Sequence, residues 1–291
     1  MKPDLLPKRA CKIHIEQKIT QDRIILMCLL LVAWKKIPGV PLLIAANRDE
    51  FYNRASEPAH FWPEEPNLLA GRDMKKGGTW LGLHRTGKIA ALTNYRDLKR
   101  AKSGEKSRGE LPVRYLNSDI SASRFPEMIS SEMNLYDGFN MLLYDSHSLW
   151  YFSNREPKGR GEAKSLTEGV YGLSNAFLNT PWPKIEKTRS RFKKLITTSA
   201  ISELGLFELL TDRETWPSGK LPDTGLTPEM EEAVSAPFIK TEHYGTRCTT
   251  LLWVYEDGQA RFIERSYYPG GCRVSGQKEF ELNLNLNLNL N

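Results

Sequence analysis

Cysteine is scarce in this sequence, with four cysteines among 291 residues. Domains held together by disulfides are far richer in cysteine, so a disulfide scaffold is excluded and a reducing compartment is indicated. The chain also lacks GxGxxG, Walker A and CxxC motifs, and its five histidines show no paired metal-ligand spacing. Dinucleotide binding, phosphate-loop chemistry, structural zinc and covalent haem therefore have no support in the sequence.

Long apolar runs are missing as well. The longest, IILMCLLLVAW at 24–34, is too short for a membrane-spanning helix, which needs roughly 20 residues. It starts late in the chain, two lysines follow at once, and no small-residue cleavage site is present, which argues against a signal peptide. The run predicts a buried β-strand, and we expect no stable membrane span.

Charge of one sign is not in large excess. The chain has 41 basic and 35 acidic residues, a net charge of +6, which requires no nucleic-acid or membrane partner. We therefore expect no nucleic-acid partner. A cytoplasmic location is expected, with mitochondrial import left open because residues 1–26 are basic.

The pattern of apolar residues predicts more strands than helices. Hairpins are predicted around Gly87 and at Asp257-Gly258. The predicted strands are 42–46, 79–83, 88–93, 139–144, 149–152, 249–255 and 261–264, and the predicted helices are 182–198, 202–210, 227–234 and one or two within 111–133. Because strands and helices come in blocks, an α+β fold is favoured over a doubly wound parallel sheet.

Composition divides the chain into three parts. Residues 1–27 form a basic extension, 28–281 a single domain, and 282–291 a Leu-Asn alternation that we expect to be disordered or a loose edge. Within the domain, 97–108 carries five basic and two acidic residues. This segment is either a solvated mobile loop or a contact for an anionic ligand.

Cys28 directly follows Met27, and this position gives the cysteine a second interpretation. Alone it reads as a structural cysteine in an apolar strand. If translation begins at Met27, removal of that methionine makes Cys28 the N-terminal residue. A free α-amine, with a pKa of about 7.7–8.0, can then take the thiol proton.

Four polar residues, Asn47 to Glu50, follow the apolar run LLIAA. They form either a salt-bridged end of a strand or part of a site. In the second case Arg48 lowers the pKa of the Cys28 thiol, and Asp49 holds the α-ammonium or orients the amine.

Several unusual motifs make a family resemblance visible, in the order MCLLLVAW, LIAANRDEFYNRAS, GGTWLGLHRTGKIAALTNYRD, SRGELP, YGLSNAFLNTPWPK and YGTRCTTLLW. Over residues 27–268 the chain resembles the NRDE family, also called the transport and Golgi organization protein 2 family. That family begins with Met-Cys. Residues 1–26 are therefore a mis-called start, an autocatalytically removed propeptide or a retained extension.

The NRDE family in turn is similar to cysteine-type N-terminal-nucleophile (Ntn) hydrolases. This resemblance implies a four-layer αββα sandwich of two mainly antiparallel sheets. It implies that Cys28 is the nucleophile with Arg48 and Asp49 as its partners, that Asn94 and Asn175 are amide donors near the oxyanion, and that Arg247 is a second arginine against the nucleophile or substrate. The plainer alternatives are turn capping by the two asparagines and a structural ion pair of Arg247.

Two functions remain open at this stage. One is an Ntn-type amidohydrolase that cleaves the amide bond of a small acylated substrate without a cofactor. The alternative is a non-catalytic haem or lipid binding and trafficking protein on the same fold. His84, Cys28 or Met27 could then serve as a haem ligand.

Overall fold

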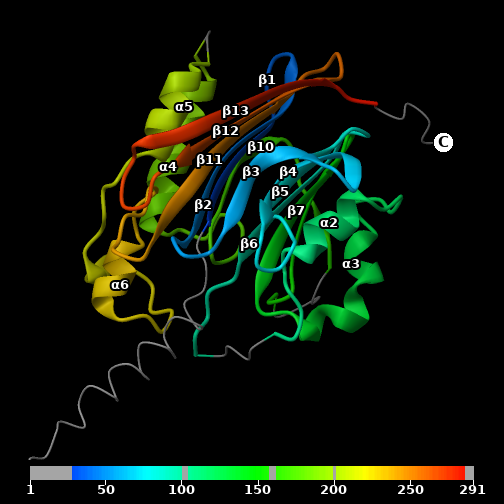
Figure 1. Ribbon diagram of the computed structural model, residues 1–291. Coiled ribbons are helices and arrows are strands. Elements are labelled where there is room, and N and C mark those ends of the chain that lie inside the picture. Colours follow the sequence, from blue (N-terminus) through cyan, green and yellow to red (C-terminus); the bar gives the residue numbers. More distant parts are fainter. Residues whose placement is uncertain (1–27, 100–103, 157–161, 199–200, 286–291) are drawn as a thin grey trace, which may run out of the picture.

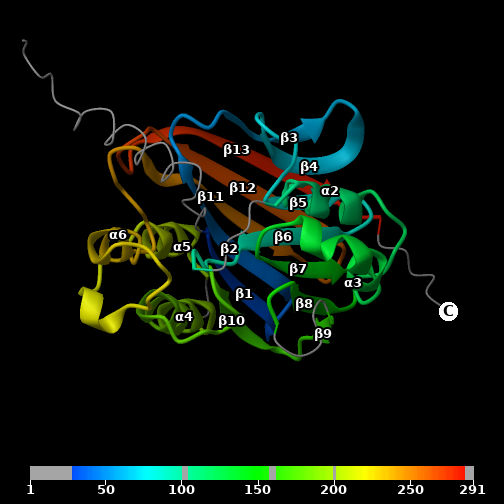
Figure 2. The ribbon, with the colours of Figure 1, turned by 90° about the horizontal axis from the view of Figure 1, so that it is seen from below.

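Two antiparallel β-sheets pack face to face with helices on both outer sides (Figure 1). The structure is a computed structural model that describes residues 28–99, 104–156, 162–198 and 201–285. Helices on one outer side come from the middle of the chain, and those on the other from its C-terminal half (Figure 2).

The first sheet has six strands and contains the predicted apolar strand. Its order is β10 (Gly169–Leu173), β1 (Cys28–Ile37), β2 (Val40–Phe51), β11 (Tyr244–Val254), β12 (Gln259–Tyr267) and β13 (Val274–Asn283). Residues 24–27 of the predicted strand lie outside the described residues.

The second sheet has seven strands in sequence order. They are β3 (Ser56–Trp62), β4 (Glu65–Asp73), β5 (Leu81–His84), β6 (Lys88–Asn94), β7 (Phe139–Asp145), β8 (Leu149–Ser153) and β9 (Lys164–Ser165). The hairpin predicted at Gly87 connects β5 and β6, and Gly87 has φ +87°, a conformation that glycine adopts without strain.

Three layers of hydrophobic core separate the four layers of secondary structure. One lies between the sheets and includes Leu30, Ile44 and Leu142. A second lies under α2 (Glu110–Leu116), α3 (Phe125–Met128) and the 3₁₀ helix η1 (Ser130–Leu135). The third lies under α4 (Pro183–Ile196) and α5 (Glu203–Leu210). The predicted four-layer αββα sandwich is thus confirmed.

Helix starts follow their sequence signals. Pro183 occupies the first turn of α4, where a missing N–H costs nothing. Thr227 caps α6 (Pro228–Ala233) by accepting a hydrogen bond from the Met230 N–H. The short 3₁₀ helix η2 (Ser218–Lys220) precedes α6. Among the described residues, no helix combines the length and the apolar content needed to cross a bilayer.

Strand pairing in the six-stranded sheet brings the candidate residues together. Cys28, the first residue of β1, lies directly opposite Arg48 of β2. On the other side of β2, Thr246 of β11 pairs with Asp49 and Cys248 pairs with Arg48, so Arg247 is an extra, bulged residue. A bulge of this kind re-aims a side chain, and here it is the side chain of Arg247.

The start of the Leu-Asn tail belongs to the sheet. β13 runs to Asn283, and both Leu282 and Leu284 are buried. The Leu284 N–H donates to the Gly258 carbonyl and the Asn285 N–H to that of Arg85. Residues 286–291 lie outside the described residues.

Candidate active site

A cavity of about 470 Å³ opens beside the first residue of β1. Cys28, Arg48 and Asp49 line it from the six-stranded sheet, Asn94 lines it from the other sheet, and Trp80 lines it from the position just before β5. The segment 104–109, just before and at the start of α2, closes another side. The cavity therefore lies where the two sheets and the loops at their ends meet.

The residues Asn47 to Glu50 all lie within β2 and are all at least 95% buried. Alternation along a strand sends successive side chains to opposite faces. Arg48 and Glu50 form an ion pair on the cavity side, whereas the Asn47 amide donates to the carbonyl oxygens of Leu210 and Pro237. Arg48, Glu50 and Asn47 are tolerated on these covered faces because each of them has a polar partner.

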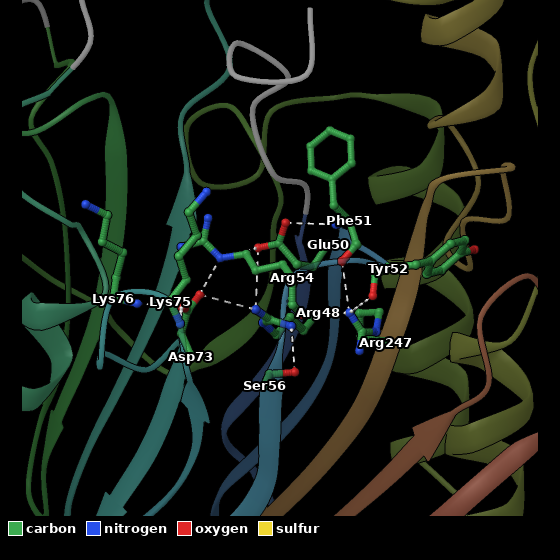
Figure 3. Close-up of polar contacts among 10 residues, drawn as sticks. All are labelled: Arg48, Glu50, Phe51, Tyr52, Arg54, Ser56, Asp73, Lys75, Lys76 and Arg247. Atoms are coloured by element: carbon green, nitrogen blue, oxygen red, sulfur yellow. Dashed lines mark hydrogen bonds and ion pairs between the residues drawn. The ribbon is translucent and has the colours of Figure 1, made fainter. Parts of the chain in front are cut away.

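Two arginines and two carboxylates form a buried network at the cavity (Figure 3). Arg48 Nη2 lies 3.4 Å from Glu50 Oε2 and 3.6 Å from Asp73 Oδ2. Arg54 Nε lies 2.6 Å from Asp73 Oδ2 and 3.4 Å from Glu50 Oε2. The Arg48 guanidinium also lies over the Trp80 ring, 4.2 Å from its centroid. Within this network the positive and negative charges balance.

Removing the central cation should therefore destabilise the fold. We expect Arg48→Met to lower the free energy of unfolding by about 3–5 kcal/mol, because Glu50 is completely buried and would lose one of its two cations. Urea unfolding measures this, with Arg273→Met, an exposed site, as the matched control. Equal stability of the two variants would show that the network contributes nothing.

Burial and neighbouring groups act in opposite directions on the Cys28 thiol. With residue 27 still attached, the pKa of this thiol is raised to about 12, chiefly by burial and secondly by the negative charge of Asp49. A hydrogen bond from the Asp49 backbone N–H and the positive charge of Arg48 lower it. The contribution predicted for Arg48 thus has the expected sign but is smaller than the effect of burial.

Asp49 combines one satisfied oxygen with one that has no partner. Thr246 Oγ1 donates to Asp49 Oδ1 at 2.6 Å, whereas buried Oδ2 has no hydrogen-bond partner in the described part of the chain. Burial raises the pKa of this carboxyl above its usual range, and the positive charge of Lys184 opposes that shift. A buried acceptor without a partner is costly, so Oδ2 is suited to a donor that the described residues do not supply.

Lys184 is the functional candidate that sequence reasoning missed. It lies in the first turn of α4 with 3% exposure, and its Nζ donates to the Val234 carbonyl at 3.3 Å. Burial lowers the pKa of Lys184, and the negative charge of Asp49 opposes that shift. The motif TPWPK contains this lysine, but a motif does not reveal that its ammonium is buried.

The two predicted amide donors occupy different places. Asn94 ends β6 and lines the cavity, whereas Asn175 is fully buried and is not among the lining residues. Asn175 Nδ2 donates to the Asn94 carbonyl at 2.9 Å. Ser174 Oγ lies within hydrogen-bond distance of both the Cys28 carbonyl oxygen and Asn175 Oδ1. Asn175 therefore lies outside the cavity and helps to position Asn94 directly and Cys28 through Ser174.

The side chain of Arg247, which belongs to β11, reaches the end of β2 and the segment that follows it (Figure 3). Its Nη1 donates to the carbonyl oxygens of Phe51 and Arg54 at 2.9 and 3.0 Å, and it is not among the residues that line the cavity. Neither the predicted contact with nucleophile or substrate nor the alternative ion pair describes this placement. The bulge of β11 has turned the side chain toward backbone carbonyls.

The charged segment 97–108 contributes to the cavity at its C-terminal end. Arg108 lines the cavity, and burial lowers its pKa to about 10, so it stays a cation at neutral pH. The missing side chain of Gly78 allows this segment to approach closely, because a Cβ at that position would lie 2.3 Å from the backbone carbonyl carbon of Gly109. Arg108 is therefore half-buried in the cavity wall, whereas Glu105 and Lys106 of the same segment are exposed to solvent. Residues 100–103 lie outside the described residues.

The residues considered for haem are spread out. His84 lies in β5 with Nδ1 2.8 Å from Thr86 Oγ1 and does not line the cavity, and Met27 lies outside the described residues. Among the described residues, no group of three or more His, Cys, Asp or Glu side chains is arranged to hold a metal ion.

Comparisons with known proteins agree with the motifs. The family model "Transport and Golgi organisation 2" matches residues 27–269. The chain is 38% identical to the Transport and Golgi organization 2 homolog of Mus musculus and 37% identical to that of Homo sapiens, covering 77% of this chain and 86% of each relative.

Two solved structures have a lower similarity. A mutant of the conjugated bile acid hydrolase from Clostridium perfringens has a TM-score of 0.49 at 11% identity, covering 90% of this chain and 99% of that chain. The Caenorhabditis elegans N-acylethanolamine-hydrolyzing acid amidase ortholog has a TM-score of 0.39 at 10% identity, covering 77% and 92%. The match to the family model, together with the identity to the mammalian proteins, shows that this chain belongs to the Transport and Golgi organisation 2 family.

Proposed function

We propose that this protein is a cysteine amidohydrolase that cleaves the amide bond of a small acylated molecule through Cys28, once Cys28 is the N-terminal residue. One observation carries the proposal: Cys28, at the start of β1, lines the cavity together with Asp49, whose buried Oδ2 has no hydrogen-bond partner among the described residues. An N-terminal α-ammonium at Cys28 is a donor that could satisfy this oxygen.

In the proposed reaction the α-amine takes the thiol proton, and the thiolate attacks the amide carbonyl carbon. The tetrahedral intermediate carries an oxyanion, for which Asn94 is the candidate donor from the cavity wall. The C–N bond then breaks, the α-ammonium protonates the leaving amine, and a thioester remains on Cys28. Water, deprotonated by the α-amine, releases the carboxylic acid and restores the thiol.

The pair Asp49 and Lys184 would support this cycle from the far side of the sheet. Asp49 would hold the α-ammonium, and the ammonium of Lys184 would keep Asp49 ionised when the α-amine is neutral. Arg48 lies opposite Cys28 and favours the thiolate. Each group thus has a separate electrostatic task.

Trapping the thioester tests the proposal. We expect that, after incubation with acyl anilides, the peptide beginning at Cys28 gains the mass of the acyl group, because the thioester is an obligatory intermediate. Peptide mass spectrometry after an acid quench measures this, and Cys272→Ala should give the same adduct. An adduct that never occurs on Cys28, in a chain whose N-terminus is Cys28, would refute the proposal.

A further inference from the structure

Arg108 differs from the other arginines of the cavity in having no carboxylate partner. Its Nη1 donates to the Gly138 carbonyl at 3.0 Å, and within the described part of the chain no ion pair joins it to an acid. By contrast, Arg48 and Arg54 share Glu50 and Asp73. A guanidinium has five N–H donors, so most of those of Arg108 remain for a ligand.

The neighbouring acids form no ion pair with Arg108 in the described part of the chain, although burial lowers its pKa and the negative charge of Asp137 acts on it to oppose that shift. Lys106 also lines the cavity, and its ammonium pairs with Glu132, which does not. Asp137, which also lines the cavity, accepts a hydrogen bond from the Gly104 N–H at 3.1 Å, and Glu105 is exposed. Lys75 and Lys76 add positive charge at the rim, with side chains exposed to solvent and directed away from Arg48 (Figure 3).

The backbone around Arg108 is held firmly. The Thr79 N–H donates to the Gly109 carbonyl at 2.9 Å, and Gly78 allows the two segments to touch. Apolar surface for the rest of a ligand is close by, because Trp80, Leu92 and Phe51 line the same cavity. The cavity thus offers an apolar wall and one pre-positioned cation.

We propose that Arg108 is a specificity residue that binds a carboxylate on the substrate, so that the protein acts on acyl amides carrying a negative charge. A planar guanidinium binds a carboxylate through two parallel hydrogen bonds. A single inward-lying guanidinium that has no ion pair in the described part of the chain, with Asp137 and Glu105 nearby, suits one negative charge better than a doubly charged phosphate. The inference rests on the proposed function only for the identification of the ligand as substrate.

Binding to the Cys28→Ala chain tests the inference without hydrolysis. Calorimetry would compare N-decanoylglycine, whose carboxylate lies on the amine side of the amide bond, with the neutral N-decanoylglycinamide. It would also compare 8-anilino-8-oxooctanoic acid, whose carboxylate lies on the acyl side, with its neutral primary amide. We expect at least one acid to bind about tenfold or more tightly than its neutral partner, as a charge-assisted hydrogen bond would give.

Arg108→Gln should abolish that preference, whereas Arg273→Gln, an exposed site with the same charge change, should keep it. If Arg108→Gln fails to fold, Arg108→Lys decides, because an ammonium cannot form the two parallel bonds and should lower the preference at least about threefold.

Three results would overturn the inference: no preference for either acid, a preference that survives these substitutions, or tighter binding of N-decanoyl-phosphoethanolamine that depends equally on Arg108. Failure of hydrolysis in the unmodified chain leaves the binding result unchanged, and failure of binding leaves hydrolysis through Cys28 untouched. The two proposals can therefore fail separately.

Discussion

The Cys28→Ala chain is expected to hydrolyse acyl anilides about 10⁴-fold more slowly than the chain with Cys28, measured as kcat. Without the thiol no thioester can form, and the loss of a nucleophile commonly removes most of the catalytic effect. The α-amine, Arg48 and Asp49 all remain in this variant. The experiment therefore isolates the sulfur atom from its surroundings.

Cys272→Ala is the matched control for this substitution, because Cys272 is also partly exposed but does not line the cavity. It should retain full activity. Equal thermal unfolding midpoints of both variants would show that neither change disturbs the fold. A Cys28→Ala chain with unchanged kcat would contradict the proposed nucleophile outright.

The second large effect concerns the N-terminal residues. In the chain that retains residues 1–27, we expect iodoacetamide to alkylate Cys28 at pH 8 about 10³-fold more slowly than in a chain whose first residue is Cys28. With the thiol pKa at about 12, only about 10⁻⁴ of it is thiolate at pH 8. A free α-ammonium adds a positive charge beside the sulfur and lowers that pKa.

The two chains should also differ in their pH dependence. A thiol loses its proton as pH rises, so alkylation of the extended chain should become about tenfold faster per pH unit until pH approaches the thiol pKa. The chain that begins at Cys28 should level off at a lower pH. Alkylation of Cys272 within the same molecules is the internal control. If Cys28 were alkylated at the same rate in both chains, and both chains hydrolysed the substrate equally fast, the α-amine would have no role in catalysis.

Strands rich in apolar residues could be predicted from the sequence, and the others could not. β2, β6, β7 and β11 contain continuous apolar runs because both faces of their sheets are covered. β3 contains Pro58 and polar residues, which is tolerated because β3 is an edge strand with a register shift at this point. β13 is mostly polar because it too lies at an edge, so its sequence resembles a loop.

The candidate site shows a similar division. The pairing of Cys28 with Arg48 and the positions of Asp49 and Asn94 follow from residues at strand ends, which the motifs mark. Whether these residues carry out catalysis stays a prediction. The placement of Arg247 depends on a one-residue bulge, which no periodicity reveals. Lys184 and Arg108 appear in the sequence as ordinary surface cations, because only tertiary packing buries Lys184 and places the half-buried Arg108 in the cavity wall.

The cavity is assembled from two sheets, and this origin bears on how such a site can change over time. Cys28, Arg48 and Asp49 come from β1 and β2, whereas Trp80, Leu92 and Arg108 come from the second sheet and its loops. Mutations on the second sheet can alter which molecules are admitted while the register between β1 and β2 stays intact. Descendants of one ancestral chain could thus diverge in their choice of ligand and still share the same reacting centre.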